Sequence, residues 1–128
     1  MLLSHISLQC ADLDAAAQFY DTVLAPLGGT RIMDMAPHAI GYGRPGPFPA
    51  PEFWIGPQET GEGFRESHVA FDAATRADVD AFFAAATAAG AQVLHAPRLW
   101  PEYTPTYYGA FVRDPDGNNV EACCMAPE

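Results

Sequence analysis

Two histidines and two glutamates occupy matching places in a chain that repeats itself. The segment Ser-His-Ile-Ser-Leu near the N-terminus recurs as Ser-His-Val-Ala-Phe in the second half, so that His5 falls on His68. Two further stretches of equal length run from an arginine through a turn-rich sequence to a glutamate, and they place Glu52 on Glu121. Imidazole and carboxylate side chains together suit a divalent transition metal. The spacing predicts one divalent metal ion per site, held by these four residues.

The residue types also suggest what such a site could do. Two neutral imidazoles and two carboxylates balance the charge of a divalent cation, and either Glu121 or Glu52 could detach from it and act as a catalytic base. If Glu52 is not a ligand, His5, His68 and Glu121 remain as a triad of two histidines and one carboxylate, which suits Fe(II) and oxygen chemistry. The sequence leaves the metal open among Zn, Ni, Co, Mn and Fe.

The elements that must position these residues follow the same order in both halves. Alternation over residues 3–10 indicates a half-buried strand, and an amphipathic helix with an N-cap at Asp12 ends at Gly28. A second strand begins at His68, and Thr75 opens a second helix. Shorter strands are expected at 30–35, 39–43 and 52–56, and again at 91–96, 106–113 and 118–124. The order predicts an α+β fold of two βαβββ modules.

One unit of this kind cannot bury its apolar face alone, so the two modules are expected to share a single domain over residues 1–128. Module 1 is expected at about 1–57 and module 2 at about 66–126. On all four ligand strands the proposed ligand alternates with aliphatic residues on the opposite face. With helices covering the aliphatic face, the four polar side chains would point into a cup-shaped, barrel-like curved sheet.

Composition limits the partners. Sixteen acidic residues against six arginines give a net charge of −10, which disfavours nucleic acid and anionic membrane surfaces. The absence of lysine excludes Schiff-base chemistry. Three cysteines without a paired spacing indicate neither a disulfide framework nor a zinc knuckle. With no recognisable signal or membrane segment, we expect a soluble cytoplasmic protein that acts on a small molecule.

Aromatic residues near the proposed ligands could form the walls of a substrate pocket. Trp54 shares the face of Glu52, and the others lie on the strand before Glu121 or in the Pro-rich stretch that precedes it. The predicted substrate-binding residues are Trp54, Tyr107, Tyr108, Tyr103 and Trp100. His38 and His95 have no counterpart in the repeat and are expected to be structural or exposed.

These residues carry a family resemblance that covers essentially the whole chain. His5, the segment 67–71 and the Phe-Val-Arg-Asp-Pro-Asp-Gly-Asn-Asn-Val-Glu run of 111–121 resemble the vicinal oxygen chelate superfamily. That superfamily includes glyoxalase I, extradiol dioxygenases and bleomycin-resistance proteins. The resemblance implies that each module supplies half of an open cup, in which a divalent metal binds a substrate through two neighbouring oxygens.

The pattern of two histidines and two glutamates looks most like glyoxalase I, which implies a metal-dependent lyase or isomerase. The stretch before Glu52 is unusually Pro-rich and the six arginines form no glutathione-binding cluster, so the substrate is expected to differ. Two alternatives remain: an Fe(II) extradiol-type dioxygenase, and a metal-free small-molecule binding protein resembling bleomycin-resistance proteins. Members of the superfamily commonly pair, and we expect a homodimer.

Overall fold

The computed structural model describes residues 2–127 and contains the two predicted repeats. Each repeat consists of a strand, a helix and three further strands, and a short 3-10 helix, η1 (Ala25–Leu27), extends the first helix. The elements of module 1 are β1 (Ile6–Cys10), α1 (Leu13–Leu24), β2 (Thr30–Met35), β3 (Ala39–Gly43) and β4 (Phe53–Pro57). Those of module 2 are β5 (His68–Asp72), α2 (Arg76–Ala88), β6 (Val93–Leu99), β7 (Tyr108–Arg113) and β8 (Asn119–Cys124).

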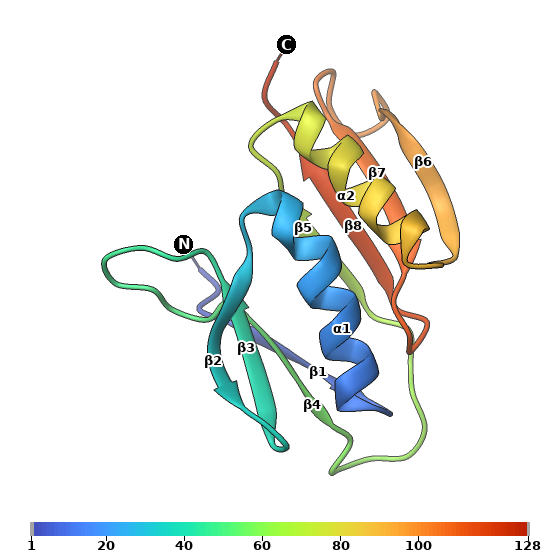
Figure 1. Ribbon diagram of the computed structural model, residues 1–128. Coiled ribbons are helices and arrows are strands. Elements are labelled where there is room, and N and C mark those ends of the chain that lie inside the picture. Colours follow the sequence, from blue (N-terminus) through green and yellow to red (C-terminus); the bar gives the residue numbers. More distant parts are fainter. Residues whose placement is uncertain (1, 128) are drawn as a thin grey trace.

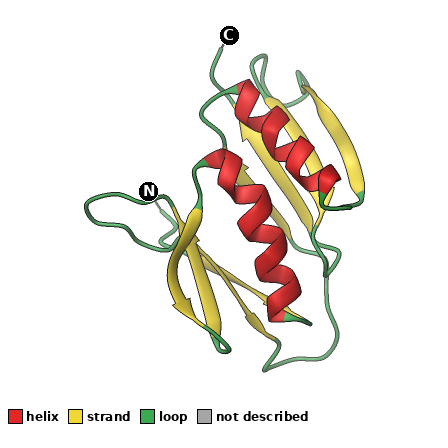
Figure 2. Cartoon of the chain, in the orientation of Figure 1, coloured by secondary structure: helices red, strands yellow, loops and turns green. Residues whose placement is uncertain are grey.

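The strands form two four-stranded sheets with the same topology. The orders are β1-β4-β3-β2 and β5-β8-β7-β6, with the first and last strands of each module pairing in parallel. Both helices lie side by side over the same side of the two sheets, which leaves the other side of each sheet uncovered (Figures 1 and 2). The predicted α+β fold of two βαβββ modules is confirmed, with two open, cup-like sheets.

The helix starts are those that the sequence signals. The side chain of Asp12 accepts a hydrogen bond from the backbone N–H of Ala15, and Thr75 accepts one from the N–H of Asp78. Each of these bonds satisfies an N–H that the first helical turn leaves without a partner. Gly28 adopts a positive φ of 80° at the end of η1, a conformation that glycine reaches without steric strain.

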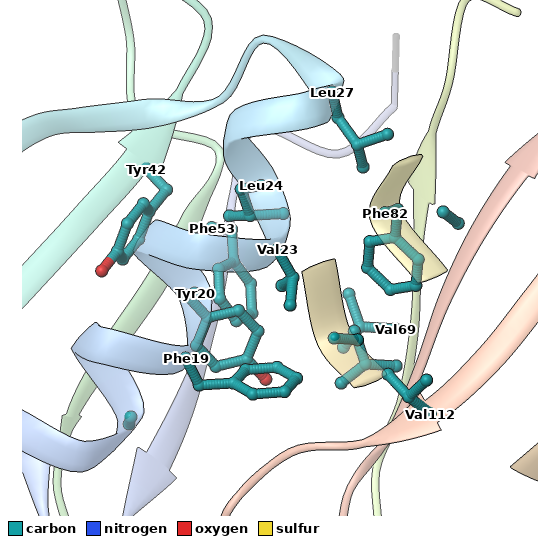
Figure 3. Close-up of a cluster of buried hydrophobic side chains, with 14 of the residues drawn as sticks. Phe19, Tyr20, Val23, Leu24, Leu27, Tyr42, Phe53, Val69, Phe82 and Val112 are labelled. Atoms are coloured by element: carbon teal, nitrogen blue, oxygen red, sulfur yellow. The ribbon is translucent and has the colours of Figure 1, made fainter. Parts of the chain in front are cut away.

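One cluster of buried side chains draws on both modules. Val23 of α1, Val79 and Phe82 of α2 and the inward residues of both sheets belong to it (Figure 3). Phe53 and Phe71 meet across the boundary between the modules in an edge-to-face contact with ring centroids 5.1 Å apart. Phe82 is fully buried, so Phe82→Ala should cost about 3–5 kcal/mol of folding free energy.

Strand β6 is longer than the sequence predicts. The strand expected at 91–96 continues through Pro97 to Leu99, and its pairing with β7 shifts register between His95 and Arg98. Proline cannot donate to a sheet ladder, but an edge strand with a bulge accommodates it. Residues 2–127 include no helix that is both long and apolar enough to cross a membrane.

Candidate active site

The carboxylate of Glu121 lies on the face of the module 2 sheet opposite the core residues Val120 and Ala122. Its side chain is almost wholly buried, with 1% of the residue exposed. His68 Nε2 lies 2.8 Å from Glu121 Oε2, and the Tyr107 hydroxyl donates a hydrogen bond to Oε1. Both carboxylate oxygens therefore have partners, which is how a buried carboxylate is tolerated.

The turn between β7 and β8 fixes the register that brings Glu121 to this place. Asp114 Oδ1 accepts hydrogen bonds from the N–H groups of Asp116 and Asn118, and the Tyr20 hydroxyl donates to Oδ2 at 2.6 Å. Gly117 provides the positive φ of the turn. These bonds anchor the Asp-Pro-Asp-Gly run to helix α1, and Glu121 then pairs with Ala70 of β5 and Phe111 of β7.

Tyr107 acts on Glu121 as a hydrogen-bond donor. Burial, followed by the hydrogen bond to Glu121, raises the pKa of the Tyr107 hydroxyl far above its ordinary value, so the hydroxyl stays protonated. Gly109 makes room for this contact, because a Cβ there would lie 3.3 Å from both Glu121 Oε1 and the Tyr107 ring. The carboxylate is thus held in one orientation by its own module.

Aromatic side chains surround the Glu121–His68 pair. Trp100 stacks on Tyr103 and meets Phe111 edge to face, while its indole N–H donates to the carbonyl of Gly109. Phe111 in turn lies beside the His68 ring, with centroids 5.9 Å apart. The predicted residues Trp100, Tyr103 and Tyr107 therefore form one wall.

The structure adds His95 to this wall and removes Tyr108. The His95 ring meets both Trp100 and Phe111 edge to face, a neighbourhood that the repeat could not reveal because His95 has no counterpart in module 1. Tyr108 points to the other face of the sheet, where its hydroxyl donates to Asp80 of α2 at 2.7 Å. The prediction that Tyr108 lines the pocket is therefore wrong, because neighbouring residues on a strand face opposite sides of the sheet.

The proposed ligands of module 1 lie elsewhere. His5 is exposed just before β1, with Nδ1 3.0 Å from the Ser4 hydroxyl, and Glu52 is exposed just before β4. His5, Trp54 and Pro51 line a cavity of about 320 Å³ on this module. A larger cavity of about 490 Å³ at the boundary between the modules is also lined by His5 and Glu52, but not by His68 or Glu121.

Strand pairing shows that the equivalence of Glu52 with Glu121 is wrong. Ser7 of β1 pairs with Trp54, and its counterpart Ala70 of β5 pairs with Glu121. Trp54 is therefore the counterpart of Glu121. Glu52 precedes the strand and matches Asn119, the residue that pairs with His68.

The four proposed ligands do not meet within one chain. Across residues 2–127, no three histidine, cysteine, aspartate or glutamate side chains gather closely enough to hold a metal ion. Within a single chain the residues therefore fit a metal only in part: module 2 offers a histidine and a carboxylate together, and a third donor would have to come from outside that module.

Comparison with known protein families shows which family this chain belongs to. The family described as glyoxalase-like domain matches residues 5–123, nearly the whole chain. The chain belongs to this family. It is thereby a member of the vicinal oxygen chelate superfamily, as the repeated histidines and the Asp-Pro-Asp-Gly run of 114–117 led us to expect.

Solved structures share the fold of this glyoxalase-like chain. A glyoxalase/bleomycin resistance protein from Albidiferax ferrireducens is 28% identical, with a TM-score of 0.81 over 97% of this chain and 99% of its own. A lactoylglutathione lyase from Agrobacterium tumefaciens is 22% identical, with a TM-score of 0.67 over 95% of this chain and 92% of its own. A search of curated protein sequences finds no match. At these identities the structures support the fold rather than one activity.

Proposed function

We propose that this chain is a divalent-metal-dependent, glyoxalase-like enzyme, a lyase or isomerase that acts on a small substrate with two neighbouring oxygen atoms. The observation that carries the proposal is the buried carboxylate of Glu121, held 2.8 Å from His68 among aromatic side chains. A buried carboxylate beside a half-exposed imidazole suits both metal ligation and proton transfer.

His68 and Glu121 would supply two ligands to the metal and His5 a third. When bound, the ion would polarise the substrate oxygens and stabilise an oxyanion. Glu121 is the preferred general base because Tyr107 already fixes its orientation. Glu52 remains a second candidate for ligand and base, although its exposure and its place before β4 make it the weaker one.

A homodimer would bring the third ligand to the pair. Because His5 lies on module 1, apart from His68 and Glu121, we propose that module 1 of one copy faces module 2 of another. Large exposed apolar side chains support an interface on module 1: Leu2 is 100% exposed and Phe48 94%. Light scattering at micromolar concentration should give twice the chain mass of 13.7 kDa, whereas a monomer mass would contradict the shared site.

Metal analysis of dialysed, tag-free protein tests the ligand set. We expect His5→Ala and His68→Ala to lose most of the metal, because each removes one of three inner ligands. His38→Ala is the matched control, since His38 is an exposed histidine of module 1. Wild-type metal content in both ligand variants would refute the site. A metal-free protein that instead binds a cationic drug tightly would indicate a small-molecule binding protein that resembles bleomycin-resistance proteins.

The strand register favours one other candidate function. With Trp54 in the place equivalent to Glu121, the site keeps two histidines and one carboxylate, the ligand set of Fe(II) oxygenases. Metal-loaded protein should therefore be screened with α-ketoaldehyde–thiol adducts and with catechols, both in air and anaerobically. Turnover that does not need oxygen supports the lyase or isomerase, and turnover that requires oxygen supports the dioxygenase.

A further inference from the structure

Trp54 occupies the position in module 1 that corresponds to Glu121 in module 2. If each module supplied a carboxylate ligand to the metal, that carboxylate would stand at this position. It pairs with Ser7 and Gly41, as Glu121 pairs with Ala70 and Phe111. An indole offers no ligand atom for a metal ion, but it offers a large, flat and polarisable surface. Module 1 therefore has an aromatic ring at the position where module 2 has a carboxylate.

The indole is held tightly in place by the strand beside it. A Cβ at Gly41 would lie only 2.9 Å from Trp54 Cε2 and Cζ2, and 2.7 Å from Pro51 Cβ. Real side chains do not approach so closely, so the missing side chain of Gly41 is what lets the indole lie against the backbone of β3. A ring fixed in this way loses little conformational freedom when a ligand binds.

The space beside the indole is suitable for a small ring. The cavity of about 320 Å³ is lined by Trp54, Pro51, Ala50 and Ser7 together with His5. This volume is at the lower end of the range for small-molecule sites. Ala50, Pro51 and Trp54 provide its apolar walls, and the two serines, Ser4 and Ser7, and the imidazole of His5 provide polar groups.

We propose that Trp54 is a stacking platform that selects substrates with a planar, conjugated ring, the oxygen atoms of that ring being directed toward His5. The inference rests on the proposed function for the metal that would hold those oxygens. The stacking itself does not require the metal.

The first experiment compares two oxygen chelators on metal-loaded protein. Tropolone is a planar ring, and acetohydroxamate is an aliphatic chelator of the same denticity. Trp54→Ala should weaken tropolone binding about fivefold to tenfold and leave acetohydroxamate within about twofold, as measured by calorimetry. Trp54→Phe should restore most of the tropolone affinity. Phe64→Ala is the control, because Phe64 is an exposed aromatic residue in the connection between β4 and β5 and does not line this cavity.

Equal losses for both chelators would mean that Trp54 only supports the site, and no loss for either would mean that it does not touch the ligand. Both results overturn the proposal. Gly41→Ala provides a second variant, since its methyl group should displace the indole without deleting it and reproduce the selective loss.

A metal-free arm separates this inference from the proposed function. In the presence of EDTA, 4-methylphenol should shift the indole N–H resonance of Trp54 and leave that of the buried Trp100 in place. If Trp54 responds here and the dialysed, tag-free protein is found to contain no metal, the metal-dependent function is refuted and the stacking platform is supported. If Trp54 does not respond up to millimolar ligand, the platform falls whatever the metal content.

Discussion

The two modules share a topology but not a site. In module 2, His68 and Tyr107 each contact the carboxylate of Glu121, beside a wall of aromatic side chains. In module 1, His5 lies just before the matching strand with no carboxylate in contact, and Trp54 replaces the carboxylate. The two modules therefore keep the same strand pairing while their faces carry different side chains, and we propose ligation for one face and contact with a ring for the other.

The connections between the last two strands of each module also differ. In module 2 the short turn of 114–118 is fixed by the carboxylate of Asp114, and Glu121 follows in a set register. In module 1 the corresponding connection, 44–52, is longer and rich in proline. Arg44 holds its start by donating to the carbonyls of Leu27 and Asp72.

The largest expected effect comes from replacing one glutamate in each module with glutamine. Glu121→Gln should lower turnover about 10²–10⁴-fold, because it removes the general base. Glu52→Gln should lower it by less than about threefold, since Glu52 is exposed and lies outside the equivalent position. Steady-state rates of the two metal-loaded variants measure this, and a larger loss in Glu52→Gln would restore Glu52 as the base.

Two adjacent tyrosines, Tyr107 and Tyr108, test whether a hydrogen bond to Glu121 supports turnover. Tyr107→Phe should lower turnover about 10–100-fold, because it removes a hydrogen bond to a charged group. Tyr108→Phe removes a hydroxyl on the opposite face and should leave turnover unchanged. A loss in kcat at constant KM is expected for Tyr107→Phe. A change confined to KM would mean that Tyr107 contacts substrate instead of positioning Glu121.

Restoring symmetry provides a gain-of-binding test. Trp54→Glu places a carboxylate at the counterpart of Glu121, and metal affinity should rise about tenfold or more because the ligand charge increases. Competition with a chromophoric chelator measures this affinity. An unchanged or weakened affinity would show that module 1 does not face the metal.

The smallest expected effect concerns the outer edge of each module. A hydrogen bond from Arg31 lowers the pKa of Asp21, so this carboxylate contributes stability above its unfolded value near 3.8 and loses that contribution as the pH falls through the lower folded value. Asp21→Asn should lower Tm by a few degrees at pH 7 and by less at pH 3, below the unfolded value. Glu102→Gln is the control in module 2, where Arg98 and Glu102 form an exposed pair. Equal effects at both pH values would contradict the electrostatic origin.

Several features of the site could be predicted from particular residues. The repeated Ser-His segments located His5 and His68, and the Asp-Pro-Asp-Gly turn located Glu121 on the face opposite Val120 and Ala122, which are confirmed as core residues. The counterpart of Glu121 could not be found by counting from Arg44, because the connections before the two strands differ in length. The role of Tyr107 was also hidden, since its partner is another side chain of the site.

The amino-acid sequence by itself determined the two modules, their helix starts and which face each strand buries, because these depend on local periodicity, capping residues and turn chemistry. Only the tertiary structure decided that Trp54 stands opposite Ser7, that Tyr107 reaches Glu121, and that His5 stays apart from His68 within one chain. Those relations depend on strand register and on the packing of distant segments, where a slip of two residues preserves the face of every side chain and leaves the hydrophobic pattern unchanged.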